Sequence, residues 1–273
     1  MDLSITISSC GSKFAPIVLQ GDYTEQIQIA YSLGFKAVEL HIKDPNAINQ
    51  PLIFRAIKDT GIKVSTIGTG QAYVDEKISF SNPDAQIRRR AVQRIKDQID
   101  FAKQLDAKII VGTIKGPMPE DPSEKVIAKN RVVECLKECA KYAEKSNTIL
   151  TLEAINRYET NYLNTAEQTV ELINEVNSPV VGLHLDTFHM NIEETSINKT
   201  LKDYSRFLTH IHFADSNRWA PGIGHLDFRS IIATLTEIKY QGFLGIECLP
   251  KPNSLDAAKQ ALNFLNSILF GNH

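Results

Sequence analysis

The stretch HIHFADSNRW at residues 210–219 holds two histidines one residue apart, followed by an aspartate, an asparagine, an arginine and the only tryptophan of the chain. If the stretch begins as a β-strand, His210 and His212 share one face and Ile211 and Phe213 the other, because side chains of a strand alternate. Such a histidine pair serves either as hydrogen-bonded core residues or as metal ligands. The choice depends on the groups that neighbouring strands bring to the same place.

Three further apolar segments end in acidic residues, and these segments are ILTLEA (149–154), VVGLHLD (180–186) and FLGIEC (243–248). In a closed barrel the outward residues lie under helices and are apolar, so the alternating polar residues face inward. This alternation predicts that Glu153, Asp186 and Glu247 face inward, as His212 does. Each is the last inward residue before a loop, so the four side chains should meet at one end of the barrel.

Four such groups predict a metal site. Three carboxylates in a dry barrel mouth repel one another and take up protons unless a cation lies among them. One imidazole with three carboxylates suits Mn²⁺ first, with Mg²⁺ or Co²⁺ as alternatives, better than a structural zinc ion, which favours sulfur and nitrogen. We therefore predict that Glu153, Asp186, His212 and Glu247 bind a divalent metal. His212 is preferred to His210 because it lies nearer the carboxyl end of its strand.

Four other polar residues share the inward face but stand outside this ligand set. His184 and His210 lie one layer deeper and are interpreted as supporting or core groups. Glu39 and His41, in the candidate strand 37–42, either line the far side of the pocket or form a buried hydrogen-bonded pair.

The chain as a whole alternates β-branched runs with amphipathic segments. The candidate strands are residues 4–8, 37–42, 63–68, 108–113, 149–154, 180–186, 209–214 and 243–248. Helix signals lie between them, with Gly34 ending the first helix, Asn82 as an N-cap before Pro83, and Thr165 with Gln168 as a capping box. Strict alternation predicts the α/β class and a single (β/α)8 TIM barrel domain over all 273 residues. An open doubly wound sheet competes, but no GxGxxG or P-loop is present.

The bulk composition argues against several function classes. A net charge of −2 gives no field that attracts nucleic acid or an anionic membrane surface. The start of the chain has no leader-like pattern and no apolar run approaches a membrane span, so we expect a cytoplasmic protein without membrane partners. The cysteines (Cys10, Cys135, Cys139 and Cys248) show no zinc or disulfide spacing and are expected to be free thiols.

Four stretches carry a family resemblance: LEAINRYETNYLNT (152–165), GLHLDTFHMNIEE (182–194), HIHFADSNRWAPGIG (210–224) and GIEC (245–248). The chain resembles the xylose isomerase-like barrel superfamily, most closely the D-tagatose 3-epimerase group of ketose epimerases, while its first half matches only in its alternation of strands and helices. The resemblance implies the same metal ligands, and it implies that Glu159, His189 and Arg218 hold substrate hydroxyls and the carbonyl oxygen. It also implies a small sugar substrate and a homodimer or homotetramer.

Epimerisation beside a carbonyl requires two bases on opposite faces of one carbon. We expect Glu153 and Glu247 to be these bases as well as ligands, the metal to act as a Lewis acid, and Arg218 to stabilise the enediolate. In VGTIKGP, Lys115 stands near the place where ketose 3-epimerases commonly have an aromatic residue. Lys115 either meets a carboxylate or phosphate, which makes a keto sugar acid such as 5-keto-L-gluconate as credible as a neutral ketose, or it is a solvated surface lysine.

Other functions remain open at this point. An aldose–ketose isomerase, including one acting on sugar phosphates, and an inosose-type dehydratase use the same metal and the same proton abstraction. An endonuclease IV-like DNA repair enzyme shares the barrel but needs further histidine and acidic ligands, which STIGTG (65–70) and VGT (111–113) do not supply. A non-catalytic sugar-binding barrel would not need both Glu153 and Glu247.

Overall fold

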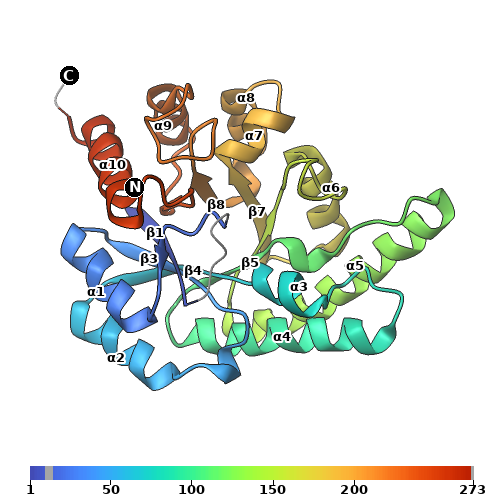
Figure 1. Ribbon diagram of the computed structural model, residues 1–273. Coiled ribbons are helices and arrows are strands. Elements are labelled where there is room, and N and C mark those ends of the chain that lie inside the picture. Colours follow the sequence, from blue (N-terminus) through green and yellow to red (C-terminus); the bar gives the residue numbers. More distant parts are fainter. Residues whose placement is uncertain (10–14, 272–273) are drawn as a thin grey trace.

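A computed structural model describes residues 1–9 and 15–271 and has the predicted (β/α)8 TIM barrel fold. Its parallel strands follow the order β1, β3, β4, β5, β6, β7, β8, β9, and β9 pairs with β1 to close the ring (Figure 1). The barrel strands are β1 (Leu3–Ser8), β3 (Ala37–His41), β4 (Lys63–Gly68), β5 (Lys108–Val111), β6 (Leu150–Glu153), β7 (Val181–Asp186), β8 (Leu208–Phe213) and β9 (Leu244–Ile246). The short β2 (Leu19–Gln20) pairs only with β1.

Helices surround the ring and cover the outer face of the strands (Figure 1). They are α1 (Tyr23–Leu33), α2 (Gln50–Thr60), α3 (Gly70–Glu76), α4 (Ala85–Lys103), α5 (Pro122–Ala143), α6 (Ala166–Val176), α7 (Thr187–Glu193), α8 (Ile197–Asp203), α9 (Phe228–Glu237) and α10 (Ser254–Leu269). Short 3₁₀ turns add η1 (Pro45–Ala47), η2 (Thr113–Lys115), η3 (Glu144–Ser146) and η4 (Ser205–Phe207). The short helices α3 and α7 follow β4 and β7 directly and lie at the carboxyl ends of the strands, where barrel active sites are built.

The strands agree with the predicted segments within a residue or two at each end, and the segment 108–113 stops two residues early. Strand β5 ends at Val111, because Gly112 (φ −92°, ψ −116°) leaves the extended conformation and η2 follows at once. This early turn redirects the chain and decides where Lys115 points.

Two of the three predicted helix signals have the expected geometry. Gly34 caps α1 in the left-handed conformation with φ 101°. The side chain of Thr165 accepts a hydrogen bond from the backbone N–H of Gln168, as in a capping box. The return bond differs, since the side chain of Gln168 accepts from the N–H of Asn164 rather than Thr165.

The predicted N-cap at Asn82 is wrong. Helix α4 begins at Ala85 and its N-cap is Asp84, whose carboxylate accepts from the N–H of Gln86. Asn82 instead accepts a hydrogen bond from the N–H of Asp84, so it forms the turn that leads into the cap.

Apolar and polar residues alternate along the strands, so the outer face of the barrel is apolar and its interior is polar. Leu150, Leu152, Leu183 and Ile211 are fully buried beneath the helices, as their outward parity requires. The inside of the barrel is polar, and inward hydroxyls bond to one another across it, such as Ser4 with Ser65 at 2.7 Å and Thr209 with Thr151 at 2.8 Å. Inward hydroxyl groups of the barrel thus bond to one another, and the ionisable residues lie towards its carboxyl end.

Within the described range, no helix is both long and apolar enough to cross a bilayer. Cys135, Cys139 and Cys248 are buried free thiols, as expected, and Cys10 lies outside the described residues. Burial raises the pKa of the Cys135 thiol to about 11, so this thiol stays protonated and unreactive at neutral pH.

Candidate active site

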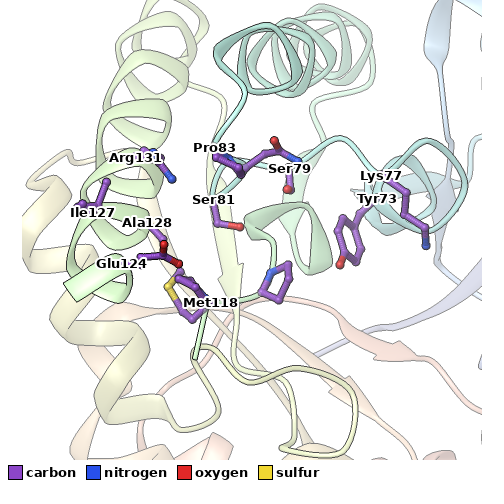
Figure 2. Close-up of a pocket in the computed structure, with 13 residues that line it drawn as sticks. Tyr73, Lys77, Ser79, Ser81, Pro83, Met118, Glu124, Ile127, Ala128 and Arg131 are labelled. Atoms are coloured by element: carbon purple, nitrogen blue, oxygen red, sulfur yellow. The ribbon is translucent and has the colours of Figure 1, made fainter. Parts of the chain in front are cut away.

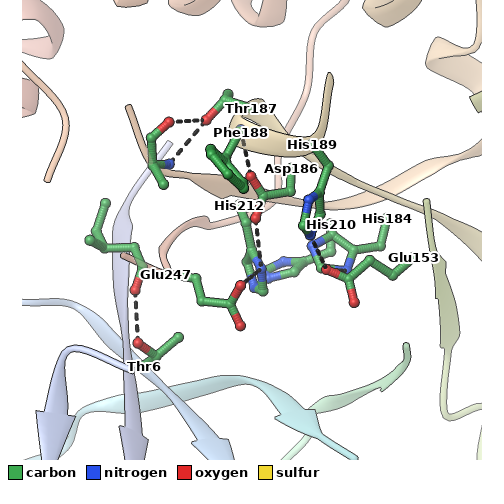
Figure 3. A network of polar contacts seen from close by, with 12 residues as sticks. Thr6, Glu153, His184, Asp186, Thr187, Phe188, His189, His210, His212 and Glu247 are labelled. Carbon is green, nitrogen blue, oxygen red and sulfur yellow. Dashed lines mark hydrogen bonds and ion pairs between the residues drawn. The ribbon is translucent and has the colours of Figure 1, made fainter. Parts of the chain in front are cut away.

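The structure brings Glu153, Asp186, His212 and Glu247 together at the carboxyl end of the barrel (Figure 3). Each offers one ligand atom, and these atoms all lie within 4.8 Å of one another. Glu153 and Asp186 are the last residues of β6 and β7, His212 is the last but one of β8, and Glu247 follows β9 directly. All four side chains are buried, with Asp186 fully inaccessible to solvent. Residues far apart in the sequence thus form one dry, charged cluster.

The donor atoms of this cluster fit a divalent cation. Nδ1 of His212 lies 3.5 Å from Oε2 of Glu247 and 3.9 Å from Oδ2 of Asp186. Nδ1 of His212 and Oδ2 of Asp186 are buried and find no hydrogen-bond partner in the described part of the chain. Buried polar atoms without partners are costly, and a metal ion among them removes that cost. Oxygen donors with one imidazole nitrogen are a set that Mn²⁺ and Mg²⁺ accept.

The electrostatics of the cluster also call for a positive charge. Burial and the neighbouring Glu247 raise the pKa of Glu153 to about 8, and burial and Glu247 raise that of Asp186 to about 6. Burial opposes ionisation of Glu247 as well, but His212, His41 and Arg218 together outweigh it and lower the pKa of Glu247 to about 2. The pKa of His212 rises well above its ordinary value because Glu39 and Glu247 outweigh the effect of burial. Either protons or a cation must neutralise these carboxylates.

Gly112 makes room for one of the predicted ligands. A Cβ atom built on Gly112 would lie 2.6 Å from Oε2 of Glu153, closer than any real Cβ contact. The residue after β5 must therefore lack a side chain for the Glu153 carboxylate to occupy its place. The same residue ends β5, so one glycine both stops a strand and admits a carboxylate.

The three residues expected to hold substrate line the same cavity as the cluster, and Glu159 lies beside both His189 and Arg218. Arg218 donates from Nη1 to Oε1 of Glu159 at 2.6 Å, and its guanidinium lies 4.8 Å from the ring centre of Phe188. Nε of Arg218 is buried and has no partner among the residues described. Nε2 of His189 lies 3.9 Å from Oε1 of Glu153. These side chains thus reach the same cavity as the acidic cluster.

Asn156 is a member of this group that sequence reasoning missed. Its Nδ2 atom lies 2.9 Å from Oε1 of Glu159 and 2.7 Å from Nδ1 of His189, and the side chain is 1% exposed. Because the amide donates to both, it holds His189 with Nδ1 as the acceptor and Nε2 towards Glu153. Burial and the charge of Arg218 lower the pKa of His189 to about 3, so this ring is neutral.

A cavity of about 180 Å³ lies over the cluster and is lined by both polar and apolar residues. Its polar lining includes His41, Gln71, Thr113, Glu153, Glu159, His189, His212, Arg218 and Glu247. The apolar lining includes Pro16, Ile17, Val74, Ile110 and Ile155. This combination suits a small ligand with several hydroxyl groups and few charges.

Lys115 does not belong to the described lining of that cavity. The side chain is 1% exposed, and Nζ donates a hydrogen bond to the backbone carbonyl of Glu153. Burial lowers the pKa of Lys115 to about 8, against the opposing effect of Glu153. Lys115 is therefore neither at the mouth of the barrel nor on the solvated surface, which were the two places expected from the sequence.

The deeper inward residues form a second layer beneath the ligand set. Nε2 of His210 lies 3.1 Å from Oε2 of Glu39, and burial lowers the pKa of His210 to about 4. The ring of His184 stacks edge-on against His212 with centroids 4.2 Å apart. Glu39 and His41 fit both interpretations, since they are hydrogen-bonded at 2.7 Å and His41 also lines the cavity.

A larger cavity of about 490 Å³ lies between α3, the segment before α4 and the start of α5 (Figure 2). It is lined by Tyr73, Lys77, Ser81, Met118, Ile127 and Arg131, among others. None of the predicted site residues contributes to its described lining. Size alone therefore does not identify the functional cavity, whereas the buried ionisable cluster does.

Comparison with known proteins supports the family resemblance expected from the sequence. Residues 27–268 match the family model described as a xylose isomerase-like TIM barrel. A D-psicose 3-epimerase of Enterocloster bolteae is 33% identical over 229 residues, which cover 81% of this chain and 75% of the relative. The 3-dehydro-D-guloside 4-epimerase of Escherichia coli is 29% identical, over 82% of this chain and 86% of the relative.

Comparison with solved structures also points to the ketose 3-epimerases. The crystal structure of a D-psicose 3-epimerase from Clostridium cellulolyticum with D-tagatose superposes with a TM-score of 0.83 at 26% identity, covering 98% of this chain and 99% of that chain. The expected resemblance is thus confirmed over almost the whole length, including the first half. The chain belongs to the xylose isomerase-like TIM barrel family and, within it, to the ketose 3-epimerase group of carbohydrate isomerases.

Proposed function

We propose that this protein is a divalent-metal-dependent ketose 3-epimerase, which inverts a carbon beside a ketone by two-base proton exchange through an enediolate. The observation that carries the proposal is the placement of Glu153 and Glu247. Both carboxylates belong to the cluster that fits a cation, and both line the cavity over it. Glu153 ends β6 and Glu247 follows β9, and these two strands are separated in the ring by β7 and β8. Two acids that face a substrate from separate directions are what proton exchange between opposite faces requires.

In this mechanism one glutamate removes the proton next to the carbonyl and the other returns a proton to the opposite face. Glu153 and Glu247 differ strongly in environment. Lys115 bonds to the backbone carbonyl of Glu153, whereas His212 and His41 lie beside the carboxylate of Glu247. Different environments suit the two roles, since one group must hold a proton while the other accepts one. When bound by Glu153, Asp186, His212 and Glu247, the metal supplies Lewis acidity towards the sugar oxygens.

The remaining groups orient the sugar and stabilise charge. The buried Nε of Arg218 has no partner among the described residues, so it can donate to the substrate oxygen that becomes negative during reaction. Its ion pair with Glu159 fixes the guanidinium plane, and Asn156 directs Nε2 of His189 into the cavity. Two hydrogen-bond donors on one side of the ligand would select the arrangement of its hydroxyl groups.

A neutral ketose fits this site better than a keto sugar acid. Lys115, the candidate partner for a substrate carboxylate, is buried and bonded to the Glu153 carbonyl. Arg218 is the only guanidinium or ammonium among the described lining residues, and it already pairs with Glu159. A substrate carboxylate would therefore enter a cavity that already holds several carboxylates, and no unpaired guanidinium or ammonium group among the described lining residues would receive it.

Incubation of the purified protein with Mg²⁺ or Mn²⁺ and a panel of ketoses and keto sugar acids in D₂O tests the proposal. NMR of the recovered sugar, after chelation of the metal, identifies which carbon gains deuterium. We expect deuterium at C3 with inversion of configuration for at least one ketose. Deuterium at C1 of the ketose, or at C2 of a newly formed aldose, would indicate an aldose–ketose isomerase, and loss of water would indicate a dehydratase. Either result would replace the proposed activity.

A further inference from the structure

Glu39 on β3 is a fully buried carboxylate that the proposed chemistry does not use. It is 0% exposed and accepts hydrogen bonds on both oxygens. Oε2 accepts from Nε2 of His212 at 2.9 Å and from Nε2 of His210 at 3.1 Å, while Oε1 accepts from Nε2 of His41 at 2.7 Å. The hydroxyl of Thr66 donates to Oε2 as well. One carboxylate thus joins three histidines from both sides of the barrel.

The bond to His212 decides which nitrogen of that ring faces the acidic cluster. An ionised carboxylate only accepts hydrogen bonds, so Nε2 of His212 must carry a hydrogen. In a ring without net charge, Nδ1 is then the nitrogen with the free lone pair. Nδ1 is the atom that faces Asp186 and Glu247 and that finds no partner in the described structure.

The bond to His41 extends the same control to Glu247. Nε2 of His41 lies 3.7 Å from Oε1 of Glu247, and Nδ1 of His212 lies 3.5 Å from Oε2 of the same carboxylate. Glu39 therefore holds the two rings that flank Glu247. The room for His41 is specific, because a Cβ atom on Gly68 would lie 2.7 Å from its Nδ1.

We propose that Glu39 is a positioning residue, which fixes His212 with a hydrogen on Nε2 so that Nδ1 is presented to the metal. This inference rests on the proposed role of His212 as a ligand. If Glu39 had a purely structural role, its bonds to Thr66 and His210 would be sufficient, and neither residue belongs to the described cavity lining. The bonds to His212 and His41 instead act on the groups that flank Glu247. Removing such a carboxylate from a metal-bound histidine typically weakens metal binding about 10- to 100-fold.

Two readouts on the Mg²⁺-loaded protein test the inference without using turnover. Ring ¹⁵N NMR of histidine-labelled protein reports which nitrogen of His212 carries hydrogen, and competition with a chelator reports metal affinity. We expect Nε2 to be protonated in the wild type, and we expect Glu39→Gln to reduce that preference and to weaken metal binding about 10- to 100-fold. The matched control is Thr66→Val, which removes a donor to the same carboxylate but does not touch His212 and should change affinity less than about threefold.

The second variant guards against loss of folding. Glu39→Asp keeps the charge but shortens the side chain by one methylene group, so the carboxylate withdraws from His212. It should also weaken metal binding about tenfold or more. Wild-type protonation of His212 together with wild-type affinity in either variant would overturn the inference. A protein that shows the expected NMR and affinity changes but exchanges no substrate proton would instead contradict only the proposed function.

Discussion

Nδ2 of Asn156 lies 2.7 Å from Nδ1 of His189, and this bond leaves Nε2 of His189 directed towards Glu153. We expect Asn156→Asp to lower kcat/KM about 10- to 100-fold, because the donor is lost and a further carboxylate is placed beside Glu159. Steady-state kinetics on the ketose that the D₂O panel identifies as a substrate, with metal content measured in parallel, checks this. A variant that keeps both its metal and its wild-type kcat/KM would show that Asn156 does not orient His189.

Gly112→Ala should displace Glu153 while leaving the barrel folded. The added Cβ would lie 2.6 Å from Oε2 of Glu153, so the carboxylate must move away from the other ligands. We expect metal affinity and kcat each to fall about tenfold or more, a loss of roughly 1.4 kcal/mol. The control is Gly70→Ala, whose Cβ meets only Oγ1 of Thr113 at 3.2 Å and should leave metal affinity within about twofold. Equal affinities for the two variants would contradict this account.

The four clustered residues are predictable from sequence because strand alternation is a strict rule. Outward residues under helices are apolar, so the parity of Leu152, Leu185 and Ile211 places their neighbours inside. The position of His212 nearer the strand end than His210 also places it beside Asp186 and Glu247, while His210 bonds to Glu39. Closure of the ring then brings the four strand ends together.

Loop residues are not predictable in the same way. The direction of Lys115 depends on the 3₁₀ turn after Gly112, and the contacts of Asn156 depend on the path of the loop after β6. Neither follows from a period of two or 3.6 residues. The error at Asn82 has a similar origin, since two acceptor side chains two residues apart, Asn82 and Asp84, are both suitable N-caps by residue type.

Metal uptake should release protons, and its apparent affinity should rise with pH between about 6 and 8. Glu153, with a pKa raised to about 8, and His212, with a pKa raised well above its usual value, both hold a proton at pH 7 when no cation is bound. A cation displaces these protons, so lower pH favours the metal-free form. Calorimetric titration with Mg²⁺ in two buffers of different ionisation enthalpy measures the release. Binding without net proton release across this pH range would contradict the assignment of these ligands.

Removing the metal should lower the thermal stability of the protein. A ligand that binds only the folded state at 100 times its Kd adds about 2.7 kcal/mol, which corresponds to a rise in Tm of roughly 5–8 °C for a chain of this size. Asp186→Asn should abolish that rise and keep the fold, because an asparagine oxygen can still accept from the N–H of Phe188, as Oδ1 of Asp186 does at 2.7 Å. Differential scanning calorimetry with and without chelator checks both. An unchanged metal-dependent shift in Asp186→Asn would exclude Asp186 as a ligand.

Proton exchange by the two single variants, Glu153→Gln and Glu247→Gln, tests the two-base mechanism most directly. Each variant, with its bound metal verified, is incubated in D₂O with the ketose that the panel identifies as a substrate and separately with its C3 epimer, and deuterium at C3 is followed by NMR. The account predicts that both variants lose epimerisation by about 10²- to 10⁴-fold, while each still exchanges the C3 proton of one sugar, a different one for each variant. Full epimerisation by both variants, or exchange of the same single sugar by both, would contradict it.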